Sequence, residues 1–253
     1  MTKVTGTDLK SATPEQLVTL SSTIALELVK GLARAKVSFA QAQTWATNKS
    51  MPQRAARKIA QELGYEIFTP DPRLVAEQAL WAKLGIALSV DELNLPEIPA
   101  GFTEIAIRPA GVTNVQLFAL IKQEREKRGE SAWKYHGNLD DIKEEQHRPS
   151  GTYVFAYRPD SEPDALHLGK SYNVAIAEKL TFLTLSERLI AELRAIILGK
   201  YFDVKGLTIT SSLASDGSAF LVYWSSGYRE SCVHGYYRSY ASPADGPRQA
   251  VFA

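Results

Sequence analysis

The spacing of apolar residues changes near residue 100 of this 253-residue chain, where strand-like segments first join the helical ones. Before that point apolar residues recur every three or four positions, as in Leu17, Leu20 and Ile24. After it, short segments alternate between apolar and polar residues or are rich in β-branched and aromatic ones. Helices bury side chains with a period of 3.6 residues and strands with a period of two. The sequence therefore predicts the α+β class, with a helical region over residues 1–95 and a mixed domain over residues 100–253.

Three helices are predicted in the N-terminal region. The first begins at Thr13, whose side chain can cap the helix, and Pro14 follows at the one position that tolerates proline well. The second covers residues 52–63, and the third follows Pro72 and ends at Gly85. This third helix is expected to turn Leu74, Leu80 and Leu84 inward.

The mixed domain is predicted to begin after a linker. Residues 93–101 contain two prolines and a glycine, which is typical of a connection between folded parts. Residues 103–108 and 152–157 have the composition of strands, and residues 111–128 have the spacing of a helix.

The clearest helix of the chain follows. Thr184 and Glu187 have the spacing of a capping box, and Gly199 marks the end of the helix. After it the helical period is absent, and residues 207–210 are predicted to form a strand. The expected buried stripe of the helix consists of Leu185, Leu189, Leu193 and Ile196.

Composition excludes several classes of protein. With 29 basic and 28 acidic residues, the formal net charge is +1, which argues against a whole-chain electrostatic contact with nucleic acid or an anionic membrane. Cys232 is the only cysteine, so an intrachain disulfide or a cysteine-rich zinc site is impossible. Neither a membrane-spanning apolar run nor a secretory signal is recognisable. We expect a soluble protein, either cytoplasmic or displayed on a virion or cell surface.

The last part of the chain, residues 212–253, is rich in Ser, Gly and Tyr. This is the composition of antibody-like binding loops, in which Tyr gives a large rigid contact and Ser and Gly adapt around it. Every second residue from Tyr228 to Tyr236 would share one face of a strand. That face would combine Glu, Cys and His with Tyr, which suits neither an apolar core nor a purely solvated surface. The alternative interpretation is a Tyr-rich strand that only packs on a loop of its own domain.

The same segment resembles a known family. It is similar to the C-terminal variable region of proteins that are diversified by diversity-generating retroelements, especially those of archaea and archaeal viruses. The segment from the helix at residues 183–188 through Gly199 and residues 203–205 is also similar to the part that precedes such a region. The residues that carry the resemblance in the C-terminal segment are Ser215, Asp216, Gly217, Val222, Trp224, Val233, Arg248, Ala250 and Val251.

The resemblance implies a fold and a function. The fold would be a C-type lectin fold of the formylglycine-generating-enzyme-like branch, used as a rigid platform for ligand binding without enzymatic activity, cofactor or metal. Its ligand would be an unknown protein or surface molecule rather than nucleic acid, and the N-terminal helices would serve attachment, for example to a virion, or oligomerisation. In that family a template is copied with errors at adenines, so that Asn codons become codons for many residues but typically not for Glu. Most of the outward-facing residues belong to this set of products, whereas Glu230 does not. The expected ligand-binding residues are Phe220, Leu221, Tyr223, Tyr228, Glu230, Cys232, His234, Tyr236 and Tyr237.

Three other functions have some support in the sequence. Cys232 and His234 could form a thiol–imidazole pair, but no third group that would orient the pair is evident. The basic residues 53–58 could belong to a DNA-binding helix, although the loose connection before them favours a solvated cationic face. The acidic residues 140–145 could offer oxygen ligands to Ca²⁺, but they lack the calcium-loop spacing and would equally suit the first turn of a helix.

Overall fold

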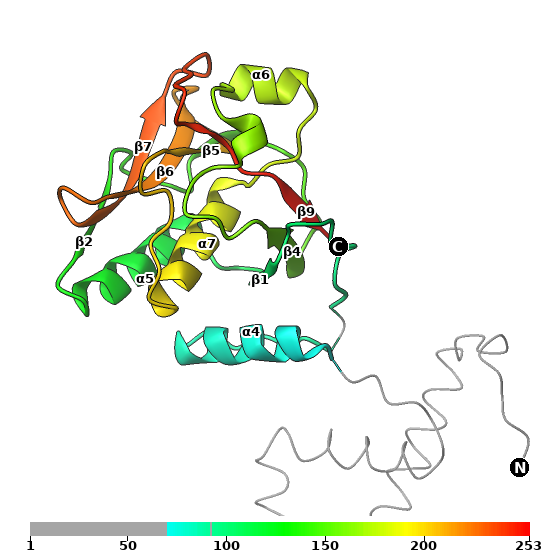
Figure 1. Cartoon of the computed structure of the whole chain (residues 1–253). Helices are drawn as coiled ribbons and strands as arrows, with labels where there is room; N and C mark the ends of the chain where they lie inside the picture. Colours follow the sequence, from blue (N-terminus) through cyan, green and yellow to red (C-terminus); the bar gives the residue numbers. More distant parts are fainter. Residues whose placement is uncertain (1–69, 92) are drawn as a thin grey trace, which may run out of the picture. The chain divides into compact units, whose positions relative to one another are not determined.

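The computed structural model describes residues 70–91 and 93–253 (Figure 1). The helices predicted at Thr13 and at residues 52–63, and the basic residues 53–58, lie outside the described residues. The described part is a mixed α+β unit, as the sequence predicted. Its elements are α4 (Pro72–Lys83), β1 (Glu104–Arg108), α5 (Asn114–Glu126), β2 (Ser131–Lys134), β3 (Ile142–Glu145), β4 (Tyr153–Tyr157), η1 (Ala165–His167), α6 (Tyr172–Ala177), α7 (Leu185–Ile197), β5 (Thr208–Ala214), β6 (Ala219–Ser225), β7 (Glu230–Tyr236), β8 (Gly246–Pro247) and β9 (Ala250–Phe252).

Two sheets organise these elements. The smaller sheet has the order β1-β4-β9, and all its pairs are antiparallel. The larger sheet has the order β2-β7-β6-β5-β3, and the short strand β8 also pairs with β5. The pairs β7–β6 and β6–β5 are antiparallel, whereas β2 runs parallel to β7. Because parallel neighbours need a long connection, β2 and β7 come from distant parts of the sequence.

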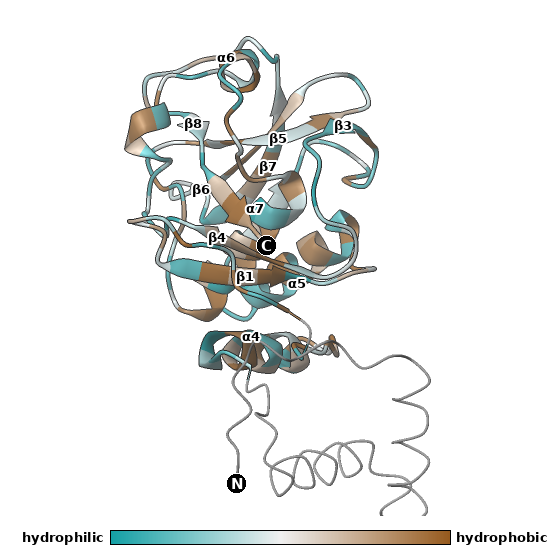
Figure 2. Ribbon diagram, turned by 90° about the vertical axis from the view of Figure 1, so that its right-hand side faces the viewer, coloured by the Kyte–Doolittle hydropathy of each residue, from teal (hydrophilic) through white to brown (hydrophobic). Residues whose placement is uncertain are grey.

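Helix α7 lies at the centre of the unit, beside α5 and against strands of both sheets (Figure 2). The predicted capping box is present, because the side chains of Thr184 and Glu187 each accept a hydrogen bond from the other residue's backbone amide. The predicted stripe of Leu185, Leu189 and Leu193 is buried. The sequence predicted only one buried face, but every residue of α7 up to Ile196 is buried because both sides of the helix are covered. Its charged side chains are therefore also in the interior.

Helix α4 packs against β1 and belongs to the same core. Leu74 is buried, as predicted, while Leu80 and Leu84 are only half-buried. Trp81 is fully buried, which the sequence analysis did not anticipate. The segment interpreted as a linker also lies on this core, because Leu93, Leu95 and Ile98 pack against it.

Helix α6 covers the outer surface of the larger sheet at β5. Tyr172 and Ala175 of α6 form a second apolar cluster with Ile209, Leu213 and Leu221 of the sheet. Helix α6 spans only six residues and is not among the helices predicted from the sequence. Beyond this cluster the same surface is open near β2 and at the end of β7, where Trp133, Tyr135 and Tyr236 are exposed. No helix in the described part of the chain is long and apolar enough to cross a membrane.

Candidate functional site: an open aromatic face over a buried charge chain

Strand β7 separates two sets of side chains, as the alternation predicted. Ser231 and Val233 point toward α5 and α7 and are almost fully buried. His234 and Tyr236 lie on the opposite surface, together with Glu230, and are partly exposed. The predicted run began too early, because β7 starts at Glu230 and Tyr228 lies in the turn before it.

The inward surface of β6 and β7 rests on an aromatic and cationic stack. Trp224 is buried, and its ring lies 4.1 Å from the guanidinium carbon of Arg125 and 4.6 Å from the ring of Tyr201. Ser231 of β7 accepts a hydrogen bond from Arg125 at 2.8 Å and donates one to Glu192 at 2.6 Å. These contacts fix the backs of the two strands to α5 and α7.

Arg125 is one end of a chain of buried opposite charges. Arg125 binds Glu192 at 2.7 Å, Glu192 binds Arg188 at 2.9 Å, and Arg188 binds Asp203 at 2.7 Å. Asp203 then binds Arg248 at 2.6 Å. Each charge has an opposite partner, which is what makes ionised groups tolerable in an interior. We call this set, together with Glu130, which binds Arg125 at 2.8 Å, the buried charge chain.

The residues that carry the family resemblance thus have structural roles. Trp224, Val222 and Val233 are buried between the sheet and the helices, and Arg248 is part of the buried charge chain. In the turn between β5 and β6, Asp216 accepts a hydrogen bond from the Ser218 amide at 2.9 Å. The next residue, Gly217, has a φ of 81°, which favours glycine.

Side-chain rings cover the outward surface of β7 and its neighbours. The His234 ring lies 5.0 Å from Tyr135 and 4.9 Å from Tyr236, and Tyr236 lies 4.5 Å from Tyr240. Trp133 approaches His234 at 5.8 Å. Aromatic rings at such separations attract one another and form a rigid surface. We define the aromatic face as Trp133, Tyr135, Tyr223, His234, Tyr236 and Tyr240.

Two prominent members of this face were missed by the sequence analysis. Trp133 and Tyr135 retain 42% and 60% of their accessible surface, although both are large aromatic residues. They belong to or follow β2, about a hundred residues before β7, and reach the face only because β2 pairs in parallel with β7. The alternating order Trp133, Lys134, Tyr135 is a period-two signal that could have identified a strand here.

Several expected ligand-binding residues are not presented at the surface. Phe220 and Leu221 are essentially buried, the first toward the interior and the second under the cluster formed by α6. Cys232 points outward but is only 4% exposed. Tyr228 and Tyr237, in contrast, retain 83% and 84% of their surface. Glu230 is half-buried and accepts a hydrogen bond from the Ser131 hydroxyl at 2.9 Å.

The predicted acidic candidates for Ca²⁺ have other partners. Residues 142–145 form strand β3, where the sequence analysis considered a helix, and Asp140 accepts a hydrogen bond from the Asn114 amide at the start of α5. Glu145 accepts one from the hydroxyl of Ser212. Among the described residues, no group of three or more His, Cys, Asp or Glu is placed to hold a metal ion.

Cys232 and His234 do not have the geometry of a nucleophile and its base. The Cys232 sulfur lies 3.8 Å from a carboxylate oxygen of Glu230, while Nδ1 of His234 accepts from the Gly235 amide at 2.9 Å. Burial raises the pKa of the Cys232 thiol to about 11, and the nearby Glu230 adds to this rise. The thiolate, which is the reactive form, is therefore scarce at neutral pH.

We accordingly expect Cys232 to react slowly in the folded protein. At pH 8, labelling by a thiol-specific disulfide reagent should be at least about a hundredfold slower in the native chain than in the same chain in denaturant. The reason is that both the raised thiol pKa and the burial of the sulfur vanish on unfolding. Absorbance of the released reagent measures the two rates. Rapid labelling of the native chain would show that Cys232 is accessible and would reopen the nucleophile interpretation.

The described residues thus form an α+β unit in which a rigid, buried charge chain supports an open aromatic face. We compared the chain with protein-family models, with curated proteins and with solved structures. None of the three comparisons finds a match.

Proposed function

We propose that this chain is a non-enzymatic recognition protein that binds a protein or surface ligand through the aromatic face. The observation that carries the proposal is the division between the two faces of β6 and β7. Inward side chains such as Trp224 and Ser231 are locked to the helices, while Tyr223, His234 and Tyr236 remain on the outside. A scaffold of this kind allows the outer residues to change without loss of the fold.

The exposed composition favours binding to a large partner. Exposed aromatic residues that lie together on one surface are uncommon on a monomer and are typical of interaction sites. Tyr and Trp are the residues that most often dominate binding energy, because they offer a wide contact at a small entropic cost. The ring contacts between Tyr135, His234 and Tyr236 reduce that cost further, since the side chains are already ordered.

The resemblance to retroelement-diversified proteins agrees with this division. We propose that the unit has the C-type lectin-like fold that the resemblance implies, and that its C-terminal face is diversified. The positions that fit the diversification pattern and are exposed or half-exposed are Tyr223, Tyr228, His234, Tyr236 and Tyr237. Glu230, which does not fit that pattern, instead bonds to Ser131 of β2 and is better explained as a fixed residue.

Deep sequencing of this locus across a natural population tests the proposal. We expect substitutions to concentrate at codons 223, 228, 234, 236 and 237, and at 232 where a small side chain fits. Codons 216, 217, 224 and 248 should be spared, because a turn glycine, the Trp224 stack and the buried charge chain tolerate little change. An invariant segment, or variation spread evenly over the gene, would disprove diversification of this face.

A further inference from the structure

A second site lies away from the aromatic face, beside β3. A cavity of about 320 Å³ opens between the ends of β1, β3 and β4 and the first turn of α7. Because β3 and β2 occupy opposite ends of the larger sheet, this cavity is independent of the aromatic face and of the function proposed for it. Its volume is at the lower end of the range of small-molecule sites, roughly 300–1,000 Å³.

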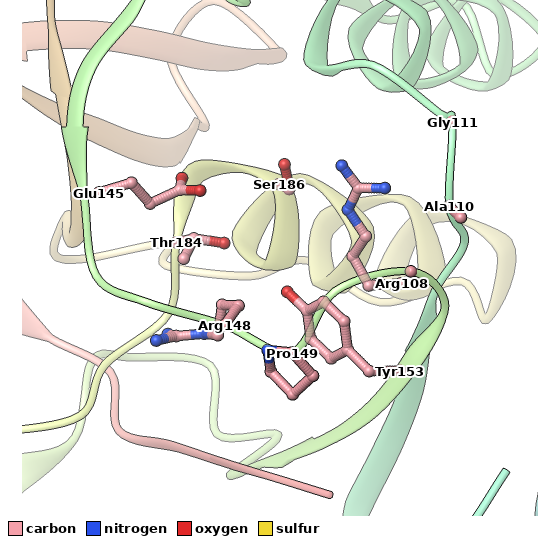
Figure 3. Close-up of a pocket in the computed structure, with 10 residues that line it drawn as sticks. Arg108, Ala110, Gly111, Glu145, Arg148, Pro149, Tyr153, Thr184 and Ser186 are labelled. Atoms are coloured by element: carbon pink, nitrogen blue, oxygen red, sulfur yellow. The ribbon is translucent and has the colours of Figure 1, made fainter.

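One pair of charges in the wall of the cavity is already neutralised. Arg148 binds the carboxylate of Glu187 through two nitrogens, at 2.6 and 3.0 Å, and Glu187 also accepts a hydrogen bond from the Tyr153 hydroxyl. Figure 3 shows the guanidinium of Arg148 directed away from the space. This pair therefore stiffens the wall and leaves little charge for a ligand.

The remaining two charges have opposite signs and lie on opposite sides of the space. Arg108, at the end of β1, donates to the carbonyl of Pro109, and among the described residues no carboxylate forms an ion pair with it. Glu145, on β3, accepts from the Ser212 hydroxyl through one carboxylate oxygen. Figure 3 shows Arg108 and Glu145 facing the space from its two sides, with the hydroxyl groups of Thr184, Ser186 and Tyr153 between them.

The start of α7 adds to the polarity of the cavity. Thr184 caps this thirteen-residue helix, and Ser186 lies in its first turn. The helix dipole places partial positive charge there, on the side of the space toward which Arg108 points. The Glu187 carboxylate already accepts from the Thr184 amide at the start of α7, and the Ser186 hydroxyl donates to Asn114 at 2.6 Å. An anionic ligand group is therefore favoured by Arg108, while Glu145 favours a cationic group.

We propose that this cavity binds a small zwitterion of the amino-acid class. Its carboxylate would bind Arg108 at the end of β1, and its ammonium group would bind Glu145 on β3. Thr184 and Tyr153 line the space between these ends with hydroxyl groups that are already bonded to Glu187, so recognition depends on Arg108 and Glu145.

Calorimetric titration of the full chain with glycine and L-alanine tests the proposal. We expect both to bind with dissociation constants in the millimolar range or tighter, and acetate and ethylamine to bind at least about tenfold more weakly, because each supplies only one charge. The longer zwitterion γ-aminobutyrate shows whether the spacing of the two charges matters. Equal binding of acetate and glycine would reduce the cavity to an anion site, and absence of binding by both amino acids at about 50 mM would overturn the proposal.

Matched variants separate the site from general charge effects. Arg108→Gln and Glu145→Gln should each weaken glycine binding at least about tenfold. Lys143→Gln and Glu144→Gln remove the same charges from exposed neighbours on β3 that do not line the cavity, and they should leave binding unchanged. Circular dichroism confirms that each variant is folded. Equal losses in the control variants would contradict a site built from Arg108 and Glu145, and Tyr236→Ala should have no effect on glycine binding.

Discussion

Replacing Asp203 by alanine is expected to lower the free energy of unfolding by about 3–5 kcal/mol. The Asp203 carboxylate is fully buried and accepts hydrogen bonds from Arg188, Arg248 and Thr208. In the intact buried charge chain, three carboxylates balance three guanidinium groups, namely Glu130, Glu192 and Asp203 against Arg125, Arg188 and Arg248. Without Asp203, an uncompensated positive charge stays in the interior. Urea denaturation followed by circular dichroism measures the loss.

The control for this prediction is an exposed carboxylate. Glu126 on α5 is well exposed and lies 4.0 Å from Lys122, so Glu126→Ala should change the free energy of unfolding by less than about 1 kcal/mol. Asp203→Asn keeps the shape of the side chain but removes its charge. Its loss of unfolding free energy should lie between the losses for Asp203→Ala and Glu126→Ala. If Asp203→Ala is as stable as the unaltered chain, the buried charge chain does not stabilise the fold.

Replacing Trp224 by alanine is expected to cost about 3–5 kcal/mol of unfolding free energy. The indole is nearly completely buried, stacks on the Arg125 guanidinium and contacts the ring of Tyr201. Its removal leaves a cavity and takes away the aromatic partner of a buried cation. Chemical denaturation of the variant and of the unaltered chain under the same conditions gives the difference.

Tyr236→Ala is the matched change on the other side of the sheet. Tyr236 is the last residue of β7 and retains 37% of its surface, and its ring lies against His234 and Tyr240 of the aromatic face. We expect the melting temperature of this variant to stay close to that of the unaltered chain. Unfolding by Tyr236→Ala would mean that its side chain belongs to the core, and the assignment of this surface to ligand binding would then be incorrect.

Trp224 and Tyr236 represent the two opposite faces of strands β6 and β7. The strands β6 and β7 are held from behind by side chains that pair with α5 and α7, among them Ser231 and Trp224. Under the proposed function, stability and recognition would depend on opposite faces of the same strands.

The parts of this protein that depend on local pattern were predictable from the sequence. The capping box at Thr184, the end of that helix near Gly199 and the strand of residues 152–157 were each placed within a few residues. The alternation in β7 assigned inward and outward residues correctly from Glu230 to Tyr236. Such features depend on neighbours in the chain, so their signals are complete within a short window.

Contacts between distant segments, in contrast, are visible only in the tertiary structure. Trp133 joins the aromatic face through a parallel pairing with a strand about a hundred residues later, and Leu221 is buried because α6 covers it. Charged residues on α7 are buried because Asp203 and Arg248 meet them there, while a helical pattern alone places such residues on the surface. Sequence periodicity determines which side of a strand or helix a residue occupies. Whether that side meets solvent or another element is decided only when the segments pack together.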